Sequence, residues 1–291
     1  MIISWSLYFT ILKEIFMYNL VELAALNAEQ QIAHMNTIFQ RQFGDALPGS
    51  YAAEKQFDYY LSEYDELKSH LGSGFVSDEI RDDIGDMLTT ILGTAWRAGF
   101  NLPAHNWIRD HDALAESPDN FNGEKSKEMQ DRIAQLTDEL KKVFIDKEER
   151  DTIKLHDQLY TLTDVIYRWA LHIGIPVHLD LSLVTASNLS KVCNGKACLE
   201  RTYEKYNNIG VELRHEEVEP DVYVVFSAKQ QTGTDGKVYD DNKFLKSVDF
   251  YEPVFPSLSR ESALARVGMV AAAVQQTPTI LLDATGNELK K

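Results

Sequence analysis

Two neighbouring stretches decide the predicted fold: YAAEKQFDYYLSEYDELKSHL, residues 51–71, and SDEIRDDIGDMLTTILGTAWRAG, residues 77–99. In the first stretch, apolar residues recur at the spacing of an amphipathic helix, along a stripe made of Phe57, Tyr60, Tyr64, Leu67 and Leu71. In the second, Ser77 is a suitable N-cap and the first turn is acidic, as a helix start favours. Because Gly72 and Gly74 break the pattern between them, we predict two helices joined by a short turn.

Similar periodicity predicts helices in four other stretches, residues 20–42, 127–145, 152–173 and 181–193, and a plausible C-terminal helix over 260–276. Short β-type runs follow Gly210, at residues 211–215, 222–228 and 237–245, around the turn-forming TGTDGK. The two halves of the helical part look like diverged copies of one helical hairpin. We therefore predict an all-α tandem helical bundle with a small β-hairpin appendage near the C-terminus.

This pattern divides the chain into four segments. Residues 1–16 are either an over-extended start or a short packing helix, since their apolar part is too short for a membrane span. Residues 17–116 form the first helical repeat, which carries the candidate site, and residues 117–200 form the second repeat. Residues 201–291 form the β-containing appendage and the C-terminal helix.

The charge balance narrows the classes of partner. The 291 residues include 45 Asp and Glu against 29 Lys and Arg, which gives a formal net charge of -16. Duplex nucleic acid is a poor candidate, because phosphate binding needs a concentrated basic face. We expect no membrane partner, and Cys193 and Cys198 are too few for a disulfide scaffold, which fits reduced thiols in the cytoplasm. A phosphorylated ligand would meet so acidic a protein most simply through divalent cations.

Two pairs of carboxylates stand out on the two deciding helices: Glu63 with Glu66, and Asp83 with Asp86. Residues three apart on a helix lie on the same side, so each pair can present two carboxylates to one cation. Sixteen residues separate Glu66 from Asp83, enough for a turn that brings all four together. Crowded carboxylates repel one another without a cation, and hard oxygen ligands are those that magnesium selects.

These residues resemble the all-α nucleoside triphosphate pyrophosphohydrolases of the MazG-like and phosphoribosyl-ATP pyrophosphohydrolase-like group, with a phage-type tandem member as the nearest fit. That family carries Glu-x-x-Glu, a gap, and then Glu-x-x-Asp, which EYDE at 63–66 and DIGD at 83–86 match, with Asp83 where Glu is usual. The segment ASNLSK, residues 186–191, looks like the family's later Asn and Lys motif.

The resemblance implies a magnesium-dependent hydrolase, with manganese as a substitute ion, that converts a nucleoside triphosphate and water to the monophosphate and pyrophosphate. By the same resemblance the four carboxylates are metal ligands, Glu63 or Glu66 orients the attacking water, and Asn188 and Lys191 contact the nucleotide. Members of the family generally act as dimers whose sites lie at helix-bundle interfaces. The resemblance therefore implies an internal pseudo-dimer here, with a homodimer of the chain as a further option. A phage-encoded protein would act in the host cytoplasm.

The second repeat departs from the pattern. Gln135 and Asp138 occupy the Glu-x-x-Glu positions, and the next helix offers either Thr161 with Asp164 or Gln158 with Thr161. Because neither placement restores four carboxylates, we predict one full metal site per chain.

Two other functions fit the same residues. The first is a non-catalytic helical protein whose acidic faces bind a partner. The second is hydrolysis of a different pyrophosphate, such as phosphoribosyl-ATP. We find no phosphate-binding glycine-rich loop, nucleophile elbow or zinc signature, which argues against P-loop enzymes, serine hydrolases and zinc hydrolases. His70 is expected to be a structural histidine.

Overall fold

The structure is a computed structural model, which describes residues 26, 28–39, 51–100, 102, 118–145 and 151–258. The predicted N-terminal segment, residues 1–16, and the predicted helix over 260–276 lie outside the described residues.

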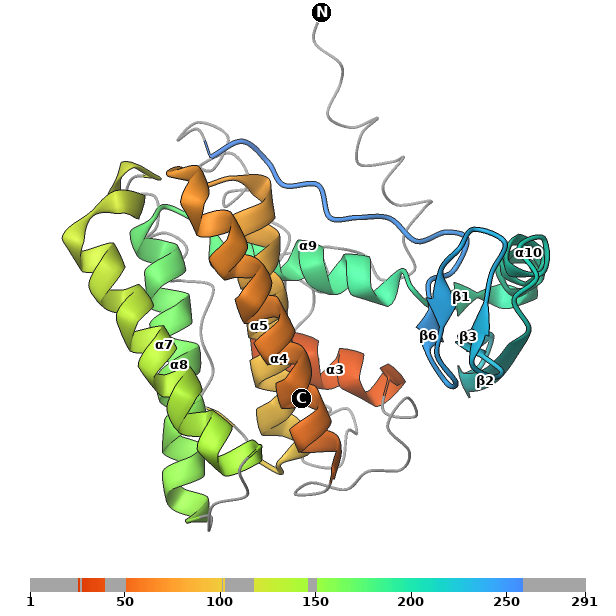
Figure 1. The fold of residues 1–291 in the computed structure, drawn as a ribbon, viewed down its shortest axis with the longest axis horizontal. Helices are drawn as coiled ribbons and strands as arrows, with labels where there is room; N and C mark the ends of the chain where they lie inside the picture. Colours follow the sequence, from red (N-terminus) through yellow and green to blue (C-terminus); the bar gives the residue numbers. More distant parts are fainter. Residues whose placement is uncertain are drawn as a thin grey trace, which may run out of the picture.

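The described residues form seven α-helices and a small antiparallel sheet, so the prediction of a mostly helical chain is confirmed (Figure 1). The helices are α3 (Ala28–Phe39), α4 (Tyr51–His70), α5 (Asp78–Arg97), α7 (Glu124–Phe144), α8 (Thr152–His172), α9 (Val177–Leu189) and α10 (Gly195–Asn207). Five of them fall on the stretches that the periodicity predicts, and α9 begins four residues earlier than predicted. Helix α10 was not predicted.

A tight connection joins α4 to α5 and sets the site's geometry. After α4, one turn of 3-10 helix (Leu71–Ser73) ends at Gly74, whose φ of 76° lies in the left-handed region that glycine adopts without strain. The Ser77 hydroxyl then accepts a hydrogen bond from the backbone N–H of Ile80, as the predicted N-cap should.

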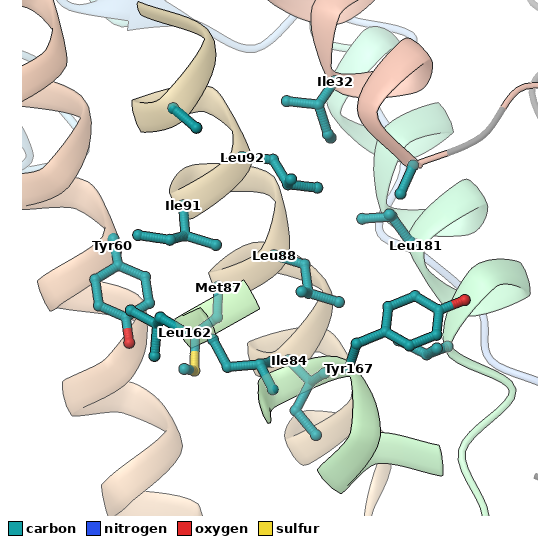
Figure 2. Packing of buried hydrophobic residues seen from close by; sticks show 14 of the residues in the cluster. Ile32, Tyr60, Ile84, Met87, Leu88, Ile91, Leu92, Leu162, Tyr167 and Leu181 are labelled. Atoms are coloured by element: carbon teal, nitrogen blue, oxygen red, sulfur yellow. The ribbon is translucent and has the colours of Figure 1, made fainter. Parts of the chain in front are cut away.

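Helix α5 is the centre of the core, and most of its residues are buried. It packs against α3, α4, α8 and α9. In Figure 2, its apolar side chains lie among those of the surrounding helices; the labelled residues are Ile84, Met87, Leu88, Ile91 and Leu92 of α5, Tyr60 of α4, Leu162 and Tyr167 of α8, Ile32 of α3 and Leu181 of α9. Because α5 is packed on several sides, its polar residues are held at fixed positions.

Helices α7 and α8 form a second hairpin that packs against the first. The Phe57 and Phe144 rings stack with centroids 4.8 Å apart, joining α4 to α7. Beside them, the hydroxyls of Tyr60 and Thr137 share a buried hydrogen bond of 2.8 Å. Because both groups are buried, this bond satisfies polar atoms that would otherwise be costly.

The appendage is larger than the predicted hairpin. Strands β2 (Leu213–Glu219) and β3 (Val222–Ser227) form an antiparallel pair, and β3 also pairs with β1 (Cys193–Asn194) and β6 (Phe244–Leu245). Strands β4 (Gln231–Thr232) and β5 (Val238–Tyr239) form a separate two-stranded ladder. All six residues of β3 are buried, and one neighbouring strand cannot cover them on every side. Strands β1 and β6 and helix α10 also pack against β3.

Residues 246–258, which we call the strap, leave the sheet and return along the helical bundle. Figure 1 shows the strap as the blue trace that runs from β6 back to the bundle. Its far end is anchored on α5, where the Arg81 guanidinium donates a hydrogen bond of 2.5 Å to the carbonyl of Pro256 and lies 4.8 Å from the Phe255 ring.

Among the described helices, none is individually long and apolar enough to cross a membrane. The combined segment of α8 and α9 meets the length and composition requirements, but the two helices are bent by 112° relative to each other.

Candidate functional site

The four predicted carboxylates lie on the facing helices α4 and α5. Glu63 is partly buried and Glu66 is exposed on α4, while Asp83 is 5% exposed and Asp86 is partly buried on α5. The short connection through Gly74 brings the C-terminal half of α4 alongside the N-terminal half of α5, so the two pairs lie on neighbouring turns.

The predicted Asn and Lys motif meets the carboxylates, although it comes 102 residues after Asp86. The Asn188 amide donates to Oδ1 of Asp86 over 3.4 Å, and the Lys191 ammonium donates to Oδ1 of Asn188. Asn188 lies in the last turn of α9, and Lys191 follows the C-cap residue Ser190. The structure therefore brings residues of both halves of the sequence into one cluster.

The electrostatics of the cluster reflect several buried like charges. Burial, together with the nearby charges of Asp86 and Glu66, raises the pKa of Glu63 to about 8. Burial also raises the pKa of Asp86, and the Lys191 ammonium opposes that effect. The pKa of Lys191 is lowered by burial, which the negative charge of Asp86 partly offsets. Each group thus needs a partner of opposite charge.

His70 has a place in the site that the sequence analysis missed. Its Nδ1 lies 2.6 Å from Oδ2 of Asp83, and this hydrogen bond raises the pKa of His70. Burial raises the pKa of Asp83, while the contact with His70 lowers it. A signal was present in the sequence, because His70 follows Glu63 by seven residues and so lies on the same helix face. His70 therefore orients one of the four carboxylates.

Asp82 is a second missed residue. Burial raises the pKa of its carboxyl to about 7, and the charges of Asp86 and Asp83 add to the effect. The adjacent acidic residues of RDDIGD are apparent in the sequence, but the i,i+3 spacing selects Asp83 and Asp86 and leaves out Asp82. The acidic cluster on α5 is thus one residue larger than predicted.

A buried ion pair fixes α5 against α9. The Arg81 guanidinium donates two hydrogen bonds, of 2.7 Å and 2.8 Å, to the two carboxylate oxygens of Asp180, and both side chains are fully buried. A bidentate pair of this kind fixes direction as well as distance. It therefore holds the start of α9 at a set position relative to the acidic turns of α5.

The donor chemistry of the cluster suits a hard divalent cation. In the part of the chain that the structure describes, no three His, Cys, Asp or Glu side chains stand close enough together to hold a metal ion as they are placed. Asp83 and Asp86 are instead turned towards His70 and Asn188. Two pairs of carboxylates lie on adjacent helices, and burial together with neighbouring negative charges raises the pKa values of Glu63, Asp83 and Asp86. Carboxylate oxygens in such a cluster are the type of ligand that magnesium prefers.

The second hairpin, formed by α7 and α8, also carries acidic side chains, three of which have hydrogen-bond or ion-pair partners. The carboxylate of Glu139 on α7 accepts hydrogen bonds from the Gln135 amide at 3.0 Å and from the Gln158 amide of α8 at 3.1 Å. Asp138 lies 3.7 Å from Lys141, and Asp164 forms an ion pair of 2.7 Å with Arg168. Each of the three carboxylates thus has a partner within the hairpin.

Comparisons of the chain with protein-family models, with curated proteins and with solved structures find no match.

Proposed function

We propose that the chain is a magnesium-dependent nucleoside triphosphate pyrophosphohydrolase with a MazG-like tandem bundle. The observation that carries the proposal is the meeting of the two predicted motifs. Asn188 contacts Asp86 across 102 residues of sequence, and Lys191 contacts Asn188. Carboxylates for a cation beside an ammonium group are the parts that a site for a metal-bound polyphosphate requires.

Glu63, Glu66, Asp83 and Asp86 would hold the ion. When bound, magnesium or manganese would neutralise charge on the phosphates and lower the pKa of the attacking water. His70 and Asn188 orient Asp83 and Asp86, a role that hydrogen-bond partners of ligand carboxylates commonly have.

Glu63 is the residue best suited to accept the proton of the attacking water. It is partly buried, and its pKa is about 8 in the metal-free protein. A bound ion would favour the deprotonated form, and the carboxylate would then be free to take a proton from the water. The water oxygen forms a bond to the α-phosphorus, the bond from that phosphorus to the bridging oxygen breaks, and pyrophosphate leaves. The water proton passes to Glu63. Lys191 balances phosphate charge, and Asn188 contacts the sugar.

The test is a substrate panel with the purified chain and magnesium. We expect pyrophosphate and the monophosphate from one or more of the common ribo- and deoxyribonucleoside triphosphates, with oxygen-18 from labelled water in the monophosphate. Phosphoribosyl-ATP belongs in the panel, because preferential turnover of that compound would reassign the substrate. Stoichiometric orthophosphate would point to stepwise phosphatase action and contradict the proposal.

Melting temperature distinguishes the enzyme from an acidic binding protein. Magnesium should raise the melting temperature, because a ligand that binds only the native state stabilises it by mass action. A protein that uses its acidic faces only to bind a partner should respond little.

A further inference from the structure

The strap is fastened to the part of α9 that carries the Asn and Lys motif. The backbone N–H of Ser247 donates to the carbonyl of Lys191 over 3.0 Å, and the Ser247 hydroxyl donates to the carbonyl of Ser190 over 2.8 Å. Four residues on, the N–H of Tyr251 donates to the Ser190 hydroxyl over 3.3 Å. These bonds fix the first half of the strap beside Lys191.

This attachment places a second lysine next to the first. The Lys246 ammonium lies 3.9 Å from the centroid of the Phe250 ring, and the Lys191 ammonium lies 5.9 Å from the same centroid. A cation is attracted to the face of an aromatic ring, so Phe250 holds Lys246 on the side of the strap that faces Lys191. The charge of Lys246 is also among the causes that lower the pKa of Lys191.

Lys246 has a partner that an anionic ligand can replace. It forms an ion pair of 3.1 Å with Glu252, in which the two side chains are 48% and 70% exposed. An ion pair so exposed contributes little stability, so exchanging it costs little. The negative charge of Glu252 also contributes to the raised pKa values of Asp82 and Asp86, as expected for a charge that lies near the acidic cluster.

We infer that Lys246 is a second phosphate-contacting residue, which exchanges Glu252 for the triphosphate chain of the substrate. The inference rests on the proposed function. It assigns the triphosphate chain of the substrate to the side of the site that carries Lys191 and Lys246. The two ammonium groups lie near the Phe250 ring and form a positively charged edge opposite the carboxylates. An acidic cluster needs such positive charge to hold a polyphosphate. Lys246 comes from the β-containing appendage, so the appendage completes the site.

Isothermal titration with inorganic tripolyphosphate and magnesium tests the inference by binding alone. We expect Lys246→Ala to weaken binding by about tenfold, as the loss of a charged hydrogen bond does. Lys243→Ala is the matched control, because it removes the same charge from an exposed position three residues earlier. Glu252→Gln should tighten binding, since Lys246 then has no competing carboxylate. Lys191→Ala serves as the reference for a phosphate contact.

The outcomes separate the inference from the proposed function. Wild-type affinity in Lys246→Ala, equal weakening in Lys243→Ala, or no binding of tripolyphosphate by the unaltered chain would each overturn the inference. If Lys246→Ala binds tripolyphosphate normally while the chain hydrolyses a nucleoside triphosphate, the proposed function stands without the inference. If binding depends on Lys246 but no nucleoside triphosphate is hydrolysed, the phosphate contact stands and the proposed reaction fails.

Discussion

At the scale of single residues, Glu63 and Asp86 carry most of the proposed chemistry. Replacing either by its amide, Glu63→Gln or Asp86→Asn, should lower turnover about a hundredfold or more, the range that general base catalysis contributes. The metal-free variants should melt no lower than the unaltered chain near neutral pH, because Glu63→Gln replaces a carboxyl that already holds its proton and Asp86→Asn removes an acid whose charged form burial disfavours. Pyrophosphate release and thermal melting measure the two effects.

Asp65→Asn is the matched control for these variants. Asp65 lies on α4 between the two glutamates, is exposed, and pairs with Lys68 at 2.5 Å. Its replacement should leave turnover nearly unchanged. Full activity in both Glu63→Gln and Asp86→Asn would rule out the site.

The raised pKa values of Glu63 and Asp82 predict how stability depends on pH without metal. Glu63 holds its proton up to about pH 8 in the folded chain, against 4.5 ordinarily, and Asp82 holds its proton up to about pH 7, against 3.8. Between these limits the folded state binds more protons than the unfolded state, so stability falls as pH rises from about 4.5 to 8. Allowing for solvent screening, the loss is about 2 kcal/mol, or a few degrees in Tm.

Melting curves across this pH range, in chelator, check the prediction. The double variant Glu63→Gln, Asp82→Asn should show a shallower fall with pH than the unaltered chain. Magnesium should also flatten the curve for the unaltered chain, because it binds the deprotonated carboxylates. Equal slopes in the double variant and the unaltered chain would show that these two groups do not hold protons in the folded state.

Some residues of the site could be predicted from the sequence, and others could not. Glu63 and Asp86 were recognisable because the i,i+3 spacing is local and the helices that carry them have a clear period. The pairing of Arg81 with Asp180 was not, because 99 residues separate them and nothing in either neighbourhood specifies the other. The role of Asn188 in contacting the nucleotide was predicted only by resemblance, and its contact with Asp86 was not predicted, since spacing alone cannot place α9 against α5.

At the scale of elements, the approach of α5 to α9 depends on Gly85. A Cβ atom added at Gly85 would lie 2.5 Å from Cγ2 of Val184 on α9, closer than two carbon atoms can approach. Glycine inside a helix costs about 1 kcal/mol relative to alanine, so close packing is a reason for it here. Residue 85 is adjacent to Asp86, and any shift of α9 moves Asn188 away from it.

Gly85→Ala should therefore impair both stability and substrate affinity. Overpacking of this kind costs about 1–3 kcal/mol, part of which the better helix propensity of alanine offsets. We expect KM to rise more than kcat falls, because Asn188 and Lys191 move while the carboxylates of α4 and α5 stay. Steady-state kinetics and melting temperature measure these changes.

Val184→Ala provides the rescue. In the double variant Gly85→Ala, Val184→Ala, the loss of the two methyl groups of Val184 makes room for the one added at residue 85, so KM should return towards that of Val184→Ala alone. A double-mutant cycle with no coupling between positions 85 and 184 would contradict the packing argument.

Element prediction succeeded for α4, α5, α7 and α8, whose long periodic stretches and caps are local signals. It failed for α10, although Leu199, Thr202 and Tyr206 lie at helical spacing and are buried. The short β-type runs were also recognisable, but their partners were not. Cys193 of β1 pairs with Tyr223 of β3, thirty residues later, and a two-residue strand has no pattern of its own.

At the scale of the whole molecule, the two hairpins differ in how they satisfy their acidic residues. In the first, Glu63 and its neighbours carry raised pKa values and lack enough cationic partners. In the second, Glu139 accepts hydrogen bonds from two glutamine amides, while Asp138 and Asp164 pair with Lys141 and Arg168. An amide donates hydrogen bonds where a metal ion would have bound carboxylate oxygens. The second hairpin is thus suited to support the first, and we expect one metal site per chain.

The difference between the two hairpins leads to the final prediction, which compares an Asp→Asn change in each hairpin. Asp164→Asn should lower kcat/KM by less than about threefold, because Asp164 forms its i,i+4 ion pair with Arg168 inside the second hairpin and has no part in the proposed metal site. Asp86→Asn should lower it about a hundredfold or more. Magnesium should still raise the melting temperature of Asp164→Asn as in the unaltered chain, but should raise that of Asp86→Asn far less. An inactive Asp164→Asn beside an active Asp86→Asn would mean that the second hairpin holds the metal, and that the amides around Glu139 position a ligand instead of replacing one.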